Sequence, residues 1–338
     1  MNVVTEFLRT LGLDHPVTFT VLFLAVSVFM IWRLEALSRH GLEGTALGTL
    51  VTPYCSGLGN LLFVFIMVRD GGKGSEVMTN CLVNNVTNLT LLLGLPALIW
   101  GLQVSPAPGG NEGRKGRGKN AGKQDTEQRL SRLSLLLTMT AVAFFTAAVW
   151  ALGQDGRLDM TDGLVLVGMF LFWQCFQVFD VLKHNVRQRQ SFGLMFYVDI
   201  VLLLAGGWVL YESLDWLVTW IGSQKSGFFR AANLGWISGW LMVLPNALLA
   251  LYYGAKRRAE VVYASQVGDG HICIPLCVGL YALARPLPIP RFFESGVIIL
   301  GAALLLHFAF LLTVGRLPRW AGLLLIAAYS WFLYEGIV

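Results

Sequence analysis

Charged residues are scarce in this chain of 338 residues. Asp, Glu, Lys and Arg together make up 13% of it and hydrophobic residues 55%, whereas a soluble domain carries about 25% charged residues. The low charge excludes an ordinary soluble domain, and the mean hydropathy of +0.63 indicates a chain that lies in lipid. The 37 Gly and 11 Trp residues fit this interpretation, because Gly lets membrane helices approach closely and Trp is enriched at membrane interfaces.

Cysteine is also sparse, and the motifs of common catalytic sites are missing. The five Cys residues lie inside apolar segments without a Cys-X-X-Cys pair, so we predict buried free thiols and no metal site. No phosphate-binding glycine loop, nucleophile elbow or His-Glu-X-X-His sequence occurs, so we expect neither an enzyme nor a cofactor. The basic stretches contain no interleaved aromatic residues, which argues against a nucleic-acid partner.

Long apolar runs are what the sequence does contain. Ten of them reach the length of about 20 residues that a bilayer span requires. They cover residues 16–34, 44–68, 76–102, 133–152, 160–182, 194–218, 232–253, 258–283, 292–314 and 319–336. Most of the 25 Lys and Arg residues follow the odd-numbered spans. The positive-inside rule therefore predicts that both termini lie outside the cytoplasm, in a plasma or inner membrane.

Polar interruptions recur at matching places in the two halves of the chain. Asn60 lies in a Gly-Asn-Leu sequence within span two, and Asn246 lies in a Pro-Asn-Ala sequence within span seven. The next span of each half has a second polar break, at 84–88 and at 268–271. Because each half has five spans, an odd number, the halves run in opposite directions across the membrane. We predict an all-α polytopic membrane protein with ten transmembrane helices in two inverted five-helix repeats, and with Asn60 near Asn246.

This organisation divides the chain into four parts. Residues 1–103 hold spans one to three of the first repeat, residues 132–192 hold spans four and five, and residues 193–338 form the second, inverted repeat. Residues 104–131 are Gly-rich and basic. Their apolar content is too low for independent folding, so we predict a flexible cytoplasmic loop.

The span count, the repeat order and the polar elements resemble those of the sodium/calcium exchanger superfamily of cation antiporters. In that family, each repeat carries a Gly-Thr-Ser-Leu-Pro-Glu-like element and then a Gly-Ser-Asn-Ile-Phe-Asn-like element. Residues 56–61 and 83–88 are similar to these elements, and residues 242–246 and 268–273 take the same places in the second half. The resemblance implies a secondary transporter in which spans one and six move against a core formed by the two repeats.

The chain differs from the family at the positions of the central carboxylates. Asn60 and Asn246 stand where the resemblance places the two cation-binding Glu residues, and Met242 and Val243 replace the Thr-Ser pair of the second repeat. Ca²⁺ is usually held by several hard oxygens that include carboxylates. An amide supplies an oxygen but no charge, so we expect a small monovalent cation such as Na⁺, or H⁺, in preference to Ca²⁺.

Polar side chains at the two breaks complete the predicted ion site. Asp269 lies within a span, where an ionisable residue is functional by default. The glycines on either side of Asp269 favour an open helix there, and direct contact with His271, two residues on, requires such an opening. Asn84 and Asn88 share one helix face opposite this pair. The predicted ion-binding residues are Ser56, Asn60, Asn84, Asn88, Asn246, Asp269 and His271.

Three other ionisable residues of the spans are expected to be structural. Glu212 and Asp215 share a helix face near the outer end of span six, where we expect them to be solvated. His307 stands alone in an apolar span, and we expect it to be a packing residue with satisfied hydrogen bonds.

Two other functions fit the same sequence. The loss of both carboxylates also fits a transport-inactive exchanger fold that serves as a membrane subunit or scaffold for a partner protein. A carrier of a neutral organic solute would need an open pocket at the membrane centre. The centre of the molecule distinguishes these hypotheses, because a polar pocket indicates transport and a dry, filled centre indicates the scaffold.

Overall fold

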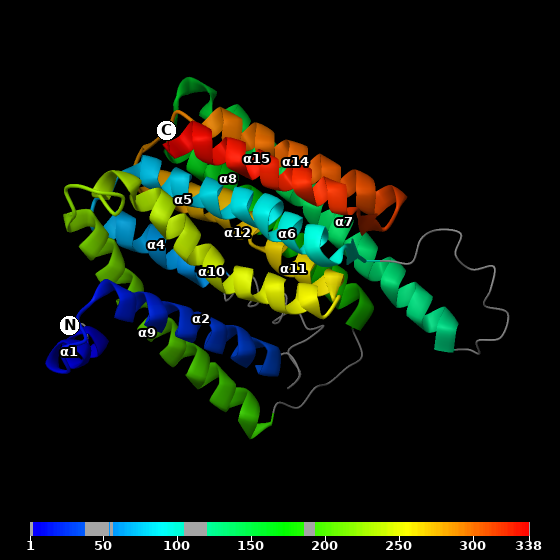
Figure 1. Ribbon diagram of the computed structural model, residues 1–338, viewed down its shortest axis with the longest axis horizontal. Coiled ribbons are helices and arrows are strands. Elements are labelled where there is room, and N and C mark those ends of the chain that lie inside the picture. The colour runs from blue at the N-terminus through cyan, green and yellow to red at the C-terminus, as the bar shows by residue number, and fades with distance from the viewer. Residues whose placement is uncertain (1–2, 38–53, 55–56, 105–119, 186–192, 338) are drawn as a thin grey trace.

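The computed structural model describes residues 3–37, 54, 57–104, 120–185 and 193–337 (Figure 1). Within these ranges, nine helical segments are long and apolar enough to cross a membrane. The shorter apolar helix α4 (Leu58–Arg69) is the described part of span two. The structure confirms the predicted all-α membrane architecture.

Two of the spans are continuous helical rods built from several elements. The third span contains α5 (Gly74–Val86), the π-helix η2 (Thr87–Leu91) and α6 (Leu92–Trp100). The eighth contains α11 (Ala259–Gly268), α12 (Gly270–Ile272), the π-helix η5 (Cys273–Cys277) and α13 (Val278–Ala284). The other helices are α1 (Val3–Thr10), α2 (Pro16–Leu37), α7 (Asn120–Leu152), α8 (Met160–Asn185), α9 (Leu194–Ser223), α10 (Leu234–Ala255), α14 (Phe293–Thr313) and α15 (Arg319–Ile337).

Contacts between a helix of one half and a helix of the other have counterparts in which the matching helices come from the opposite halves. Helix α10 of the second half packs on α5 of the first, and α4 of the first half packs on η5 and α13 of the second. In the same way α15 packs on α6 and α8 packs on α13, while α7 and α14 pack on each other. This reciprocal packing is that of two inverted repeats.

Two short antiparallel ladders show that the connections alternate between the two sides. Strand β1 (Leu102–Gln103), after span three, pairs with β4 (Arg316–Leu317), after span nine. Strand β2 (Arg157–Leu158), after span four, pairs with β3 (Leu287–Pro288), after span eight. Loops after odd-numbered spans thus meet on one face and loops after even-numbered spans meet on another.

Close helix contacts in the core depend on glycine. A Cβ on Gly94 of α6 would lie 2.9 Å from the backbone oxygen of Gly322 of α15. A Cβ on Gly163 of α8 would lie 2.8 Å from the backbone oxygen of Gly279 of α13. Because α6 and α13 are matching segments of the two repeats, the same backbone-to-backbone approach occurs once in each half.

Helices α2 and α9, spans one and six, form a pair beside this core (Figure 1). Phe19 of α2 stacks on Trp216 of α9 with ring centroids 4.2 Å apart. Arg33 Nη1 lies 3.2 Å from Asp199 Oδ1 further along the same two helices. These contacts make α2 and α9 one packed unit.

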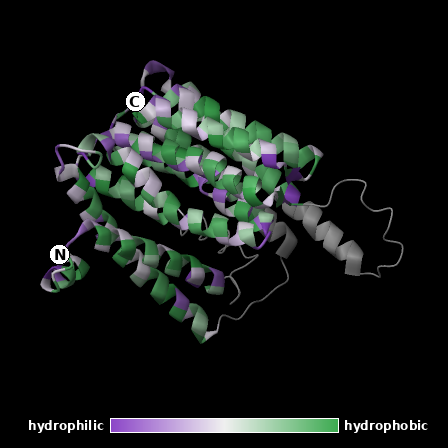
Figure 2. Cartoon of the chain, viewed as in Figure 1, coloured by the Kyte–Doolittle hydropathy of each residue, from purple (hydrophilic) through white to green (hydrophobic). Residues whose placement is uncertain are grey.

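The outer surface of the bundle is apolar over the length of the helices, and hydrophilic residues gather at the helix ends (Figure 2). Phe172 of α8 is 75% exposed and Leu305 of α14 is 72% exposed. Such exposure is expected where acyl chains, not water, surround the helix.

The structure shortens the predicted cytoplasmic loop. Helix α7 begins at Asn120, so residues 120–131 are helical although the sequence assigned them to the flexible segment 104–131. This stretch lacks Pro and contains Ala121, Gln124, Glu127 and Leu130, which are good helix formers and continue directly into the apolar part of α7. Residues 105–119 lie outside the described part of the chain.

Candidate functional site

Each repeat contains a π-helical turn at its second polar break. Turn η2 begins at Thr87 and turn η5 begins at Cys273, and the separation between these two residues equals that between Asn60 and Asn246. The repeats therefore match residue for residue through this region. A π-helical turn inserts one residue into a helix and is frequent at functional sites.

Asp269 lies at a smaller interruption than the sequence predicts. Helix α11 ends at Gly268 and α12 begins at Gly270, but Asp269 itself has helical torsion angles, φ −65° and ψ −26°. Its carbonyl oxygen accepts a hydrogen bond from the Cys273 N–H at 3.0 Å. The predicted opening at the two glycines is thus absent, and the distortion lies in the next turn, at η5.

A chain of buried hydrogen bonds joins the two halves. Asn84 Nδ2 donates to Asn60 Oδ1 at 3.4 Å, and Asn88 Nδ2 donates to Asn84 Oδ1 at 2.9 Å. Asn88 Nδ2 also lies 3.4 Å from Asp269 Oδ2, which accepts a second hydrogen bond from Asn246 Nδ2. Five of the seven predicted site residues therefore belong to one network, which we call the amide–carboxylate network. Their role in binding an ion stays a prediction.

A cavity of about 190 Å³ lies between the α2–α9 pair and this network. Asn60, Asn246, Asp269 and Ser265 form its polar wall. Its apolar lining comes from both the pair and the core and includes Phe23, Met30, Leu34, Leu210, Met242 and Leu249. Asn60 and Asn246, which the sequence predicts to lie near each other, therefore line the same pocket. Because Asn246 is midway along α10, the pocket lies at the middle of that helix.

Several buried oxygen atoms near the network have no hydrogen-bond donor among the described residues. They are Oδ1 of Asn85, Oδ1 of Asn88 and Oε1 of Gln266. The amide nitrogen of Gln266 donates to the Asn246 carbonyl oxygen at 3.2 Å, which places it beside the site. A buried acceptor without a donor is costly unless water or a cation supplies the missing contact.

Sequence reasoning missed Ser265 and Gln266. Both precede the predicted break at Gly268, and the only available signal was a pair of polar residues within an apolar span. Ser265 lines the cavity, and the Gln266 side chain donates to Ser265 Oγ at 2.8 Å. The polar wall therefore extends one helical turn before Asp269.

His271 lies away from the network. Its ring is buried against Trp173 of α8, with ring centroids 6.5 Å apart, and it lines a different cavity together with Ser134 and Thr138 of α7. Direct contact between Asp269 and His271, which would require an open helix, does not form, because the helix stays closed and residues two apart point in different directions. Ser56, the remaining predicted residue, lies outside the described residues.

Glu212 and Asp215 are buried, contrary to the predicted solvation. The Glu212 carboxylate accepts hydrogen bonds of 2.7–3.3 Å from the N–H groups of residues 3–5 and thereby holds the N-terminus of α1 on α9. Asp215 Oδ1 lies 2.5 Å from Arg69 Nη2. These donors come from distant parts of the chain, which hydropathy within span six does not reveal.

His307 has partners for both ring nitrogens, as expected of a packing residue. Nε2 lies 2.8 Å from the Leu89 carbonyl oxygen within η2, and Nδ1 lies 3.1 Å from the Tyr263 hydroxyl. Because a carbonyl oxygen only accepts, Nε2 carries the proton and Nδ1 accepts from Tyr263. His307 thus ties the π-helical turn of the first repeat to α11 of the second.

Known proteins share this architecture. A structure of the sodium-calcium exchanger NCX_Mj soaked with 2.5 mM Na⁺ and 1 mM Sr²⁺ superposes with a TM-score of 0.63 at 18% identity, covering 96% of this chain and 98% of that chain. The same exchanger soaked with 2.5 mM Na⁺ and 10 mM Sr²⁺ gives 0.61 at 19% identity, covering 99% of both chains. Without Na⁺ and Ca²⁺ it gives 0.59 at 20% identity, covering 93% of this chain and 96% of that chain. The fold is therefore that of a membrane exchanger.

The sequence comparisons agree with the fold. The profile of the sodium/calcium exchanger protein family matches residues 16–179. A search of curated proteins gave no match. The profile match covers just under half of the chain, and the shared fold extends the likeness to the rest.

Proposed function

We propose that this protein is a secondary transporter that carries a monovalent cation, or a proton, through the cavity between the α2–α9 pair and the core. The single observation that carries the proposal is the composition of the polar wall. It contains one carboxylate, Asp269, among the amides Asn60 and Asn246. A wall with one negative charge matches a cation with one positive charge.

The charge of the site argues against Ca²⁺. At an effective dielectric constant of 20 and a separation of 4 Å, each carboxylate attracts a divalent ion by about 8 kcal/mol. Asn60 and Asn246, at the positions of the two carboxylates in the family, each lack this attraction. The dehydration of Ca²⁺ is then poorly offset, whereas a monovalent ion or a proton needs only Asp269 and neutral oxygens.

The amide side chains provide the neutral oxygens. Asn88 and Asn246 now point their amide nitrogens at Asp269, and the Asn88 oxygen has no donor among the described residues. Rotation of the Asn246 amide would turn its oxygen toward the cavity when a cation sits on the Asp269 carboxylate. In this scheme the cation replaces the amide N–H donors of Asn88 and Asn246 that contact the Asp269 carboxylate.

The position of the cavity suits alternating access. Its walls come from two bodies, the α2–α9 pair and the core that carries the network. Displacement of the pair would open the polar wall to one side without breaking the core, where the repeats interlock. The scaffold alternative expects a filled centre, so a cavity with a polar wall favours transport.

The proposal is tested by ion flux into proteoliposomes. Purified protein is assayed for uptake driven by Na⁺, K⁺, H⁺ and Ca²⁺ gradients, and compared with D269N and D159N. Asp159 is an exposed N-cap residue that accepts hydrogen bonds from Thr161 and Asp162, a role that Asn fills equally well. We expect a monovalent flux that D269N abolishes and D159N retains. Flux of Ca²⁺ alone, or equal flux in D269N, would contradict the proposal.

A further inference from the structure

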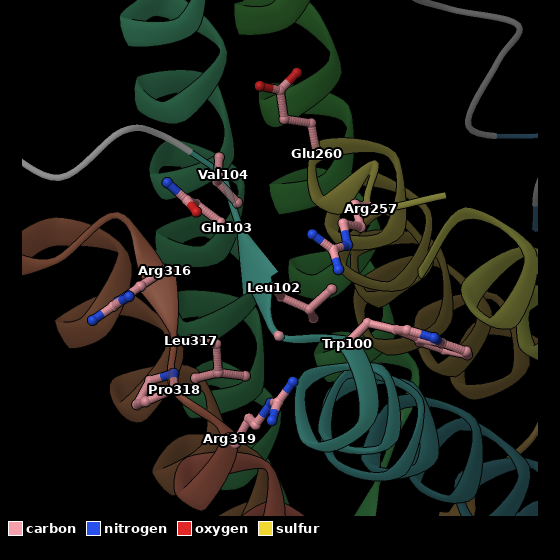
Figure 3. Close-up of a pocket in the computed structure, with 11 residues that line it drawn as sticks. Trp100, Leu102, Gln103, Val104, Arg257, Glu260, Arg316, Leu317, Pro318 and Arg319 are labelled. Atoms are coloured by element: carbon pink, nitrogen blue, oxygen red, sulfur yellow. The ribbon is translucent and has the colours of Figure 1, made fainter. Parts of the chain in front are cut away.

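An open pocket of about 750 Å³ lies at one end of the helix bundle, where α6, α10 and α14 end and α15 begins (Figure 3). Its walls are Trp100, the β1–β4 ladder and the turn before α11. It shares no lining residue with the cavity between the α2–α9 pair and the amide–carboxylate network. It lies on the side of the loops after spans three, seven and nine, which the positive-inside rule assigns to the cytoplasm.

Three arginines line this pocket: Arg257, Arg316 and Arg319 (Figure 3). Among the described residues, none of them forms an ion pair. Glu260 is the only acidic residue among the described residues of the lining, and its carboxylate points away from Arg257 (Figure 3). The guanidinium groups of Arg257 and Arg319 point toward the middle of the pocket, whereas that of Arg316 points outward beside the β1–β4 ladder (Figure 3).

The backbone around the pocket also favours an anion. Arg319 is the first residue of the 19-residue helix α15, and the partial positive charge at a helix N-terminus disfavours a cation there. Arg257 has a φ of +56° and is the only non-glycine residue with positive φ in the described part of the chain. Strained backbone of this kind tends to persist at binding sites. A bound anion would offset the electrostatic cost of Arg319 at this helix end.

We infer that this pocket binds a phosphate-bearing anion held by Arg257 and Arg319, with Arg316 adding positive charge at its rim. Guanidinium groups bind phosphate through paired N–H donors, and the pocket volume is in the range of small-molecule sites, about 300–1,000 Å³. The phosphate belongs either to the headgroup of an anionic lipid or to a soluble polyphosphate. Both sources present the same group to the three arginines.

Such a ligand would fasten the two repeats together at this end of the bundle. Arg316 lies on β4 and Arg319 on α15, both in the second repeat, while the paired strand β1 and Trp100 belong to the first. Arg257 lies in the turn that leads into α11, the helix that ends beside Asp269. A ligand that binds only the folded protein raises its free energy of unfolding by RT ln(1 + L/Kd), where L is the ligand concentration, so the unfolding temperature begins to rise as the ligand concentration passes Kd.

The test measures unfolding temperature in lipid nanodiscs, with two separate arms. In one arm the nanodisc is neutral phosphatidylcholine and inorganic pyrophosphate is titrated. In the other arm the nanodisc contains increasing phosphatidic acid and no soluble phosphate. The wild type is compared with R257Q/R316Q/R319Q and with R291Q. Arg291 is an exposed arginine that follows β3, the strand of the other ladder.

We expect a concentration-dependent rise in unfolding temperature in one of the arms, which identifies the source of the phosphate. The ligand concentration at which the rise begins should be more than a hundredfold higher in the triple variant and about tenfold higher in R319Q, because guanidinium–phosphate hydrogen bonds are among the strong, charge-assisted ones. Arg319 is exposed and is the first residue of α15, so R319Q serves if the triple variant does not fold. No rise in either arm, or an equal loss of the rise in R291Q, would overturn the inference.

Discussion

Asn88 Nδ2 and Asp269 Oδ2 lie 3.4 Å apart and join the second polar breaks of the two inverted repeats. Asn88 lies within the π-helical turn η2, and Asp269 lies one helical turn before η5. The contact closes a path of side chains from Asn60 to Asn246. The amide–carboxylate network therefore contains side chains of both repeats and only one negative charge.

Restoring the carboxylates should restore divalent-ion binding. In N60D/N246D the polar wall would carry three carboxylates in place of one, and each added charge attracts a divalent ion by about 8 kcal/mol before dehydration is subtracted. We expect Ca²⁺ or Sr²⁺ to bind at least tenfold more tightly than to the wild type, with N246D between them. Competition with a monovalent cation in a filter-binding assay measures this. Unchanged divalent affinity in the double variant would show that the two positions do not face the ion.

Two glycine substitutions in α8 should differ in their effect on stability, because one glycine is in close helix contact and the other is not. A Cβ on Gly163 would lie 2.7 Å from the Leu283 backbone nitrogen, whereas a Cβ on Gly168 would meet nothing within 4 Å. We predict that G163V lowers the free energy of unfolding by about 1–3 kcal/mol, the usual cost of overpacking. G168V on the same helix should change it by less than about 0.5 kcal/mol. Thermal unfolding in detergent compares the two, and equal stabilities would refute the α8–α13 packing.

Arg69 should hold the α2–α9 pair against the core. It belongs to α4 and contacts Asp215 of α9 at 2.5 Å, as well as the Tyr211 hydroxyl. We predict that R69Q increases hydrogen exchange of the C-terminal half of α9 while α5 stays protected. The stability loss should be about 1 kcal/mol, because Arg69 is partly exposed. Unchanged exchange in α9 would mean that Arg69 does not restrain the pair.

The same arginine sets a dependence of stability on pH. The hydrogen bond from Arg69 lowers the pKa of Asp70 below its usual value. A carboxyl group whose pKa is lowered by folding stabilises the protein above its unfolded pKa, and that contribution is lost as the pH falls through the lower folded value. The wild type should therefore lose this contribution below about pH 4, and R69Q should lose less over the same range. Unfolding temperatures between pH 3 and pH 6 test this, and parallel curves would contradict it.

His307 should stabilise the fold by supporting η2. H307F leaves the Leu89 carbonyl and the Tyr263 hydroxyl without a partner in the core, and an unpaired buried polar group costs about 1–3 kcal/mol. Y263F removes one of these groups, so H307F/Y263F should be less destabilised than the sum of the single variants. Denaturation of all three provides a double-mutant cycle. Strict additivity would show that the two residues are not coupled.

The sequence predicts the spans and the nearness of Asn60 and Asn246, which line one pocket, but not the directions of the side chains around Asp269. Length and hydropathy define the spans, and the recurrence of polar residues defines the repeats. The glycines beside Asp269 favour an open helix, but the helix stays closed and is distorted only in the next turn, at η5. Residues two apart on a closed helix face different directions. For this reason Asp269 joins the network whereas His271 contacts Trp173.

Residues whose partners are distant in the chain were also beyond sequence reasoning. Glu212 is buried because α1 supplies three backbone N–H groups more than two hundred residues away. Gln266 belongs to the site because it reaches the Asn246 carbonyl of a neighbouring helix. In both cases the tertiary contact decides the burial of a polar group, and no periodicity in the local sequence indicates it.

Of the two proposed cargoes, a monovalent metal cation at Asp269 is the one that diffraction detects, and anomalous diffraction from crystals soaked in Tl⁺ or Sr²⁺ tests its binding most directly. We predict a Tl⁺ peak in the cavity within coordination distance of the Asp269 carboxylate, no Sr²⁺ peak there, and loss of the Tl⁺ peak in D269N. A Sr²⁺ peak between Asn60 and Asn246, or a Tl⁺ peak that persists in D269N, would contradict the account.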